Sequence, residues 1–457
     1  MAIELRFLRQ LATKCSRPRW IVAFIFSFLL LTFYQFLPSI LPTGLSPYQQ
    51  LNETSFGQRG LLAQALYQQL RQAEGSPLQM TQRKHKAAEK LAKHLFPFIQ
   101  SPDGSSRDDD TPLWSLRSTF SLHSKGIVIP AGKKNLVFAR QSILALRDVL
   151  NVTLPIAVAY AGDEDLSPDQ QNSLLGLRPN VEMLDVLTVL SDEYMNLGSG
   201  SWSVKPFAAL ASRFEQVILI DADIVFVQSP EILFDDLGFQ ETGALFFYDR
   251  QFEREPGNRR QRFLEQETKD IDLLESCCQN ILKNGYTEEQ DSGVVVLDKR
   301  RLQVLIGLMH TCWQNSSPVR DKVTYDIFYG DKETFWMGMA LTQTPYTFYK
   351  NSAGIVGELR EREGKMHICG NTISHYSDAD HRLIWYNGSL LRNKYISLYI
   401  YMVPQYQILG GQCHWMGNAE GDLKRCCSDA EILALTDSER SVLEKSVEIA
   451  KNLDGHK

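Results

Sequence analysis

The sequence predicts an α/β domain over residues 121–457, built on a mostly parallel, Rossmann-like sheet flanked by helices. From residue 126 onward, short strands alternate with helix-like segments, an order that favours strand–helix–strand units. The strands are nearly continuous apolar runs, which is typical of parallel strands covered on both faces. The chain is 44% hydrophobic and 22% charged, the composition of a folded globular protein.

The expected elements follow one another along the chain. We expect strands over 126–130, 154–160, 181–189 and 216–220, and helices over 135–150, from 167 and over 205–214. Helices are indicated by apolar residues at helical spacing and by Ser167-Pro168, a helix-start signal. Ligands of parallel sheets bind beyond the carboxyl ends of the strands. The residues that follow 154–160 and 216–220 are therefore where a site is expected.

The first residues predict a membrane anchor. Residues 20–37 carry no charge, and as a helix they would span roughly 27 Å, close to a bilayer core. Basic residues cluster before this segment, which favours a type II protein with a cytosolic tail (1–19), a signal anchor (20–37), a luminal stem (38–120) and a luminal catalytic domain (121–457). A cleaved signal peptide is the alternative, although no Ala-x-Ala site follows the segment.

The stem is predicted to contain an extended linker over 38–58, rich in proline, then helices over 59–100 and a polar break at 101–111. The formal net charge of −6 disfavours a nucleic-acid partner. Four Asn-x-Ser/Thr sequons are candidate glycosylation sites on the luminal side: Asn52, Asn151, Asn315 and Asn387. Seven cysteines are also luminal, so we expect structural disulfides with one thiol left over, and the pairing stays open.

An acidic pair directly follows the strand at 216–220. Asp221 and Asp223 stand two apart, so on an extended chain both side chains point to the same side and can hold a divalent cation. The chain has four other Asp-x-Asp pairs, at 108/110, 163/165, 270/272 and 378/380, but only 221/223 is flanked by apolar strand on both sides. The alternative is that backbone N–H groups satisfy both carboxylates. Burying two acids in such a run is costly unless a cation or donors compensate.

Seven blocks in order carry a resemblance to a known family. They are 126–150, 158–167, 203–230 (SVKPFAALASRFEQVILIDADIVFVQSP), 244–252, 289–299, 329–338 and 374–390. The acidic segment resembles the metal-binding segment of GT-A-fold glycosyltransferases. The set as a whole resembles the fungal Golgi α-mannosyltransferases of glycosyltransferase family 71, with Phe246–Arg250 more similar to the α-1,3 branch than to the α-1,2 branch.

The resemblance implies a GT-A-like fold and an Mn²⁺ cofactor. Asp221 and Asp223 would be metal ligands, and His375 matches the place of a third, with His367 and His381 as competitors. A surface histidine is the alternative at each of these positions.

Further residues are assigned to the donor and to catalysis. Lys205 is expected to offset the charge of the donor's phosphates. The alternative is that Lys205 only stands at a solvated helix start. Arg140 and Lys332 are further donor-binding candidates. Asp291, Asp331 and Glu333 are the catalytic candidates. Asp331 could instead cap the helix that follows it. The pair Trp385-Tyr386 could stack on a sugar, although core packing explains these residues equally well.

The resemblance therefore implies transfer of mannose from GDP-mannose to a mannan or glycoprotein glycan in the Golgi lumen. An α-1,3 linkage is expected, formed with retention of the anomeric configuration. Two other functions stay open, namely a UDP-sugar-dependent transferase of the same fold and a non-catalytic luminal glycan-binding protein.

Overall fold

A computed structural model describes residues 55–455 except 75–77, 103–107, 109, 199–201, 252–254, 274–276, 363, 378, 393, 395–399, 411–413, 417–424 and 429. The predicted tail (1–19), the predicted anchor (20–37) and Asn52 lie outside this range. In the described part of the chain, no helix combines the length and the apolarity that a membrane crossing needs.

The helices and strands are as follows. The helices are α4 (Phe56–Glu74), α5 (Leu78–Leu95), α6 (Pro112–Arg117), α7 (Leu136–Leu144), α8 (Pro168–Leu175), α9 (Asp192–Met195), α10 (Val204–Ala211), α11 (Leu237–Thr242), α12 (Arg259–Thr268), α13 (Leu302–Gln314), α14 (Ser317–Val319), α15 (Tyr325–Ile327), α16 (Thr334–Leu341) and α17 (Asp437–Leu453). The strands are β1 (Ser121–Pro130), β2 (Ile156–Tyr160), β3 (Val181–Asp185), β4 (Phe214–Ile220), β5 (Ile224–Phe226), β6 (Ala244–Tyr248), β7 (Gln290–Asp298), β8 (Thr347–Ser352), β9 (Ile355–Arg362), β10 (Lys365–Gly370), β11 (Ile373–Tyr376), β12 (Leu383–Asn387), β13 (Tyr406–Ile408), β14 (His414–Met416), β15 (Arg425–Ser428) and β16 (Ile432–Ala434).

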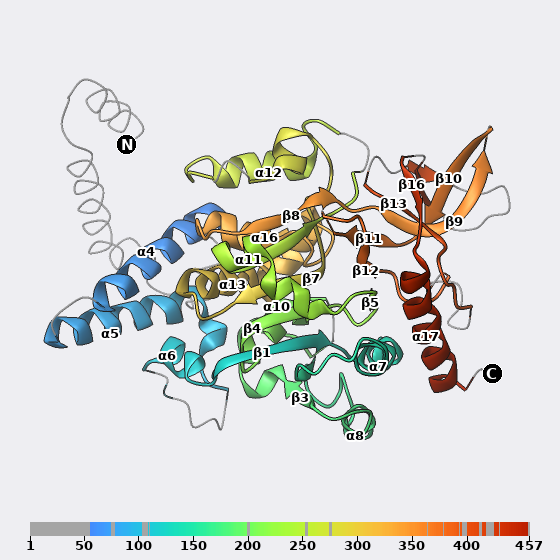
Figure 1. Cartoon of the computed structure of the whole chain (residues 1–457). Helices are drawn as coiled ribbons and strands as arrows, with labels where there is room; N and C mark the ends of the chain where they lie inside the picture. Colours follow the sequence, from blue (N-terminus) through green and yellow to red (C-terminus); the bar gives the residue numbers. More distant parts are fainter. Residues whose placement is uncertain are drawn as a thin grey trace. The chain divides into compact units, whose positions relative to one another are not determined.

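A central sheet has the strand order β3-β2-β1-β4-β7-β6-β8 (Figure 1). The pairs β2/β3, β1/β2, β1/β4 and β6/β8 are parallel, so the predicted α/β class with a mostly parallel sheet is confirmed. Strand β7 runs antiparallel to both β4 and β6. Its first residues therefore lie beside the carboxyl end of β4, and Ile220 pairs with Val294. This reversal brings two acidic segments to one edge of the sheet.

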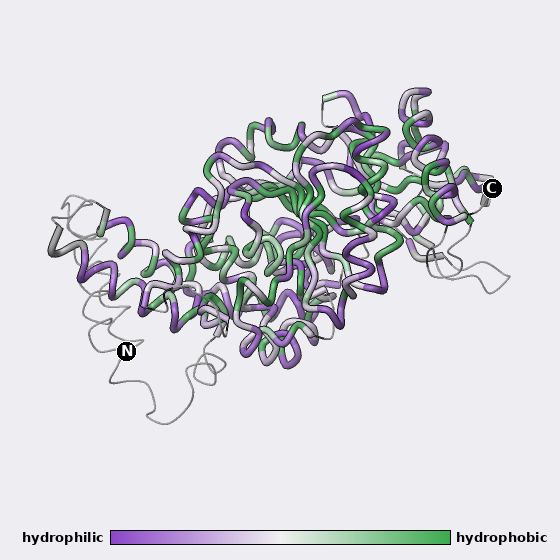
Figure 2. The backbone as a smooth tube through the Cα atoms, turned by 90° about the horizontal axis from the view of Figure 1, so that it is seen from below, coloured by the Kyte–Doolittle hydropathy of each residue, from purple (hydrophilic) through white to green (hydrophobic). Residues whose placement is uncertain are grey.

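Apolar strands form the core around this edge. Ile127, Val158, Ile218 and Val296 are fully buried, as near-continuous apolar runs predict. Figure 2 shows hydrophobic residues gathered in the interior and hydrophilic ones along the outer helices. Each such side chain stabilises the fold by about 1.5–3 kcal/mol relative to exposure. The site therefore lies at the edge of a rigid, densely packed sheet.

The helices predicted from residues 59–100 are present as α4 and α5, and they pack on the domain. Arg59 on α4 is fully buried, donates to the carbonyl of Leu95 at 2.6 Å and lies 4.1 Å from the ring centroid of Trp313 on α13. His310 on α13 contacts the carbonyl of Phe56 at 3.3 Å. Residues 54–457 accordingly form one compact unit that includes these two helices.

A second, antiparallel sheet has the order β14-β15-β10-β9-β13-β16, and a disulfide between Cys369 and Cys427 joins β10 to β15. A second disulfide links the neighbours Cys277 and Cys278. Among the cysteines that the structure describes, Cys312 is free and buried. Structural disulfides with an unpaired thiol were the expected arrangement.

Candidate functional site

The acidic turn that follows β4 is the centre of the site. Asp221 donates its N–H to the carbonyl of Gly293 at 2.9 Å, which ties the turn to β7. Its carbonyl accepts the N–H of Ile224 at 3.1 Å, so the chain reverses between β4 and β5. The side chains of Asp221 and Asp223 are 27% and 14% exposed. Both carboxylates thus stand at the end of a buried strand with partial access to solvent.

Lys205 on α10 holds two carboxylates together. Its ammonium lies 2.8 Å from Asp221 and 2.9 Å from Asp331, and it also donates to the Ser292 carbonyl at 3.0 Å. Burial alone would lower the pKa of Lys205, but the two carboxylates raise it above its ordinary value. The Asp331 carboxylate faces this lysine, while α16 begins only at Thr334, so the helix-capping alternative does not describe it.

Negative charge accumulates at the acidic turn. Burial raises the pKa of Asp221 to about 7, and the charges of Asp331 and Asp223 add to this rise while Lys205 opposes it. Asp223 in turn contacts the ammonium of Lys394. Each acid of the turn is therefore paired with a lysine in this structure.

Asp291, at the start of β7, is held by three donors. His375 contacts one carboxylate oxygen at 3.1 Å, and the other accepts the Gly293 N–H at 3.0 Å and the Asn387 amide at 3.4 Å. Burial would raise the pKa of Asp291, but its hydrogen bond to His375 and the charges of His375 and Lys332 lower it to about 2. Asp291 is therefore an ionised carboxylate at every physiological pH.

His375 is fixed behind Asp291. Its ring is 2% exposed and stacks on Trp385 with centroids 4.1 Å apart. The competing histidines lie elsewhere, His367 on β10 of the second sheet and His381 exposed in the turn after β11. Trp385 itself is fully buried, as the core-packing alternative for this residue predicted.

The three predicted metal ligands are not gathered in one cluster. Within the described ranges, no group of three His, Cys, Asp or Glu side chains is arranged to hold a metal ion. The acidic turn supplies two carboxylates, while the Nε2 atom of His375 is engaged by Asp291. In this structure His375 therefore contacts Asp291, and the assignment of Asp221, Asp223 and His375 as metal ligands stays a prediction.

Lys332 and Glu333 belong to a buried network next to the site. Lys332 contacts Asp249 and lies 3.9 Å from Glu288. Glu333 is fully buried, and its carboxylate accepts the N–H of Glu289 at 3.0 Å and the indole N–H of Trp336 at 2.5 Å. Burial, together with the charge of Glu288, raises the pKa of Glu333 well above its ordinary value. Through these hydrogen bonds, Glu333 anchors the segment at the start of β7.

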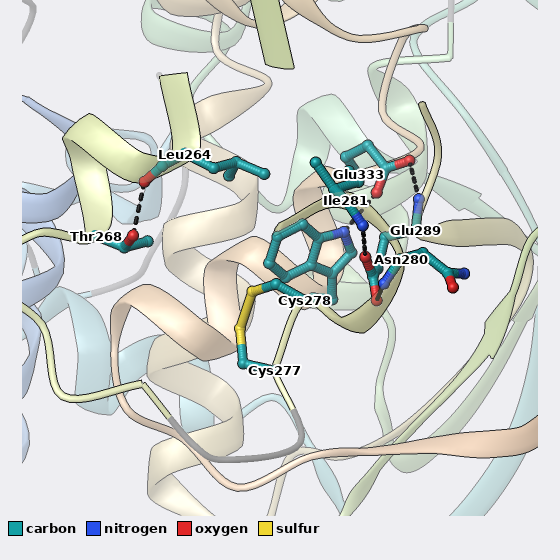
Figure 3. Close-up of a disulfide and its surroundings, with 9 residues drawn as sticks. Leu264, Thr268, Cys277, Cys278, Asn280, Ile281, Glu289 and Glu333 are labelled. Carbon is teal, nitrogen blue, oxygen red and sulfur yellow. Dashed lines mark hydrogen bonds between the residues drawn. A yellow bond between two sulfur atoms is a disulfide. The ribbon is translucent and has the colours of Figure 1, made fainter. Parts of the chain in front are cut away.

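The Cys277–Cys278 disulfide borders the same network. Figure 3 shows the bridge near Asn280 and Ile281, which follow it after Gln279 and lie next to the carboxylate of Glu289. The N–H groups of Asn280 and Ile281 donate to Glu289 at 3.1 and 2.8 Å. Glu289 immediately precedes β7, so the segment after the disulfide contributes to holding that strand in place.

A small pocket lies between α7 and the acidic turn, and Phe138, Gln141, Asp223 and Ser389 are among the residues that line it. Arg140, the weaker donor-binding candidate, stands on the same helix. Its Nε atom is buried without a hydrogen-bond partner. No contact of Arg140 joins it to the acidic turn in the described part of the chain, so its donor role stays a prediction.

The predicted sequons differ in accessibility. Asn151 is exposed. Asn315 is fully buried, and its amide donates to the Thr311 carbonyl and to the Thr334 hydroxyl, both at 2.9 Å. The amide of Asn315 therefore has no access to solvent in this fold, which disfavours a glycan there, and glycosylation of the sequons stays a prediction. Asn387 is half-buried, and its amide faces Asp291.

Two features of the site were not predicted. Lys394 contacts Asp223 but stands in no motif, and no sequence signal could have found it. Asn387 was considered only as a sequon, although it lies within the last of the seven resembling blocks and reaches Asp291.

The strand order, with a paired-carboxylate turn after β4, defines a GT-A-like glycosyltransferase fold. The chain belongs to the mannosyltransferase family described as "Mannosyltransferase putative", which matches residues 124–377.

Two curated relatives are α-1,3-mannosyltransferases of Saccharomyces cerevisiae. MNT3 is 27% identical over 324 residues, which cover 63% of this chain and 50% of the relative. MNT2 is 29% identical over 301 residues, which cover 58% of this chain and 52% of the relative. The chain thus spans about half the length of the curated relatives it matches. A solved structure of core-mannan synthase A from Aspergillus fumigatus, in its Mn/GDP form, is similar at 10% identity and a TM-score of 0.33, covering 55% of this chain and 80% of that one.

Proposed function

We propose that this protein is an α-1,3-mannosyltransferase that moves mannose from GDP-mannose to a mannose-containing glycan with retention of configuration. The observation that carries the proposal is the acidic turn Asp221–Asp223, held by Lys205 at one sheet edge together with Asp291 in a chain of the mannosyltransferase family. Its curated relatives named above are α-1,3-mannosyltransferases, which supports the linkage.

The acidic turn suits Mn²⁺. Carboxylate oxygens are ligands that Mn²⁺ accepts, and the two carboxylates of the turn stand together at the end of β4 with partial access to solvent. Asp221 and Asp223 would hold the ion. When bound, the ion would supply Lewis-acid stabilisation of the charge that develops on the departing diphosphate.

The reaction breaks the bond between mannose C1 and the β-phosphate oxygen and forms a bond from C1 to an acceptor hydroxyl oxygen. The diphosphate leaves with the electron pair of the broken bond, and the hydroxyl proton is taken up by the diphosphate. Asp291, ionised because its pKa is about 2, is too weak a base to take that proton. We infer that it instead stabilises positive charge developing on the sugar ring, either as an anion beside the ring or as a nucleophile.

Positioning follows from the remaining contacts. Lys205 fixes Asp221 relative to Asp331, and His375 fixes the carboxylate of Asp291. We also propose donor contacts for Arg140 and Lys332, and placement of the chain in the Golgi membrane through residues 20–37, with the catalytic unit in the lumen.

Product analysis tests the proposal. Purified full-length chain is incubated with mannobiose, Mn²⁺ and either GDP-mannose or UDP-galactose, with and without a chelator. We expect a trimannoside from GDP-mannose alone, with its new linkage identified as α-1,3 by NMR, and no product when the chelator is present.

The double variant Asp221→Asn, Asp223→Asn, verified as folded by circular dichroism, should give no product. Transfer from UDP-galactose instead would favour the UDP-sugar alternative. Glycan binding without turnover of either donor would favour a non-catalytic glycan-binding protein.

A further inference from the structure

Two large aromatic side chains stand exposed next to the site. Trp202 is 55% exposed and Tyr329 is 62% exposed, and their ring centroids lie 5.2 Å apart with the ring planes inclined at 40°. Exposed aromatic surface of this kind marks binding sites on soluble proteins, since an aromatic ring gains most from burial. Neither residue belongs to the donor or cation contacts described above.

Backbone contacts tie both rings to the catalytic edge of the sheet. The carbonyl of Trp202 accepts the N–H of Lys205 at 3.1 Å, and Tyr329 precedes Asp331 by two residues. The ammonium of Lys205 and the carboxylate of Asp331 are 2.9 Å apart. Since three residues span at most roughly 10 Å of chain, the Cα atom of each aromatic residue lies within that reach of the Cα atom of one member of the ion pair.

Glycine at position 330 gives the two rings their arrangement. Gly330 has a positive φ of 66°, which favours glycine, and a Cβ atom there would lie 2.8 Å from the Trp202 ring. The indole therefore rests against bare backbone beside Tyr329. Any larger residue would push Trp202 away and break the pair.

We propose that Trp202 and Tyr329 form a platform on which a pyranose ring of the acceptor glycan stacks. This inference rests on the proposed function, because an acceptor must approach the edge that holds Asp331 and Asp291. A hexose presents an apolar face of C–H groups that matches an uncharged aromatic surface, while the tyrosine hydroxyl can bond to a sugar hydroxyl. An uncharged sugar is favoured over an anionic ligand because neither of the two platform side chains carries a positive charge.

The test is acceptor kinetics with the full-length chain and the double variant Trp202→Ala, Tyr329→Ala. We expect the KM for mannotriose to rise about tenfold, which corresponds to about 1.4 kcal/mol. The KM for GDP-mannose and the slow hydrolysis of this donor by water should stay within about twofold. Gly330→Ala should reproduce the acceptor effect. Trp114→Ala is the matched control, because Trp114 on α6 is 61% exposed and lies outside the site.

An unchanged mannotriose KM would overturn the proposal. A rise in the donor KM instead would also overturn it, because the rings would then stack on the nucleotide base. If the wild-type chain turns over no donor, the proposed function fails, and the platform is then tested by calorimetric titration with mannotriose. Loss of mannotriose binding in the double variant, with binding kept in Trp114→Ala, would support the platform even without the enzymatic activity. Equal binding of mannotriose by both variants would refute the platform.

Discussion

Replacing Lys205 by methionine removes one charge from the centre of the site and changes little else. The ammonium is 5% exposed and lies within 3.0 Å of Asp221, Asp331 and Ser292. Methionine is close in volume, so no large cavity forms, but two carboxylates lose their shared cation. Removing one partner of a buried ion pair costs about 3–5 kcal/mol, because the other partner is left uncompensated.

Thermal unfolding of the purified chain, followed by tryptophan fluorescence, measures the loss. At roughly 2 °C per kcal/mol for a domain of this size, Lys205→Met should lower the Tm by roughly 6–10 °C. Adding Asp331→Asn should recover part of the loss, because it removes one of the two unpaired charges. Turnover of GDP-mannose by folded Lys205→Met should fall at least tenfold, since Asp221 and Asp331 lose their common anchor.

Lys299→Met is the matched control. Lys299 is equally buried, but its ammonium donates to the carbonyls of Ala209 and Ser212, at 2.9 and 2.6 Å. This variant should also lose stability while its folded fraction keeps normal turnover. The reasoning is refuted if Lys205→Met unfolds at the wild-type temperature, or if both lysine variants lose turnover to the same extent.

Burial, assisted by the charge of Arg59, lowers the pKa of His310 to about 3, so only the unfolded chain takes up a proton as the pH falls below about 6.5. Wild-type stability should thus fall by up to about 1.4 kcal/mol per pH unit between pH 6.5 and 5, and urea unfolding of His310→Gln should show a shallower dependence. Arg59→Met should cost about 2–3 kcal/mol in the same assay, because the Leu95 carbonyl loses its donor; an unchanged midpoint would show that α4 contributes nothing to the domain. For the sequons, Thr153→Ala should lower the glycan mass measured by mass spectrometry and Ser317→Ala should not; a loss with Ser317→Ala would contradict the burial of Asn315.

Local signals predicted most of the first half of the sheet. The helix predicted to start at Ser167-Pro168 is α8, where Ser167 forms a capping box with Gln170. The apolar runs at 126–130 and 216–220 lie within β1 and β4, and β2 covers residues 156–160 of the run predicted over 154–160. The strand predicted over 181–189 ends early at Asp185, because its side chain accepts the N–H of Leu187 at 3.0 Å and starts a short 3₁₀ turn. Such a side-chain bond is not visible in the hydrophobic pattern.

Tertiary pairing decided what the sequence could not. The run Val294–Leu297 has the same apolar pattern whether its strand is parallel or antiparallel, so the direction of β7 was not predictable. That direction is what brings the first residues of β7, which include Asp291, to the end of β4 that Asp221 follows. Likewise, the contact of Lys394 with Asp223 joins residues far apart in the chain and follows no spacing rule.

Calorimetric titration of the full-length chain with GDP, in the presence and absence of Mn²⁺, tests most directly whether the acidic turn binds a metal–diphosphate complex. The account predicts that Mn²⁺ tightens GDP binding by at least tenfold in the wild type and has no effect in the variant Asp221→Ala, Asp223→Ala. Equal GDP affinity with and without the ion, or tight Mn²⁺-dependent binding by the variant, would contradict it.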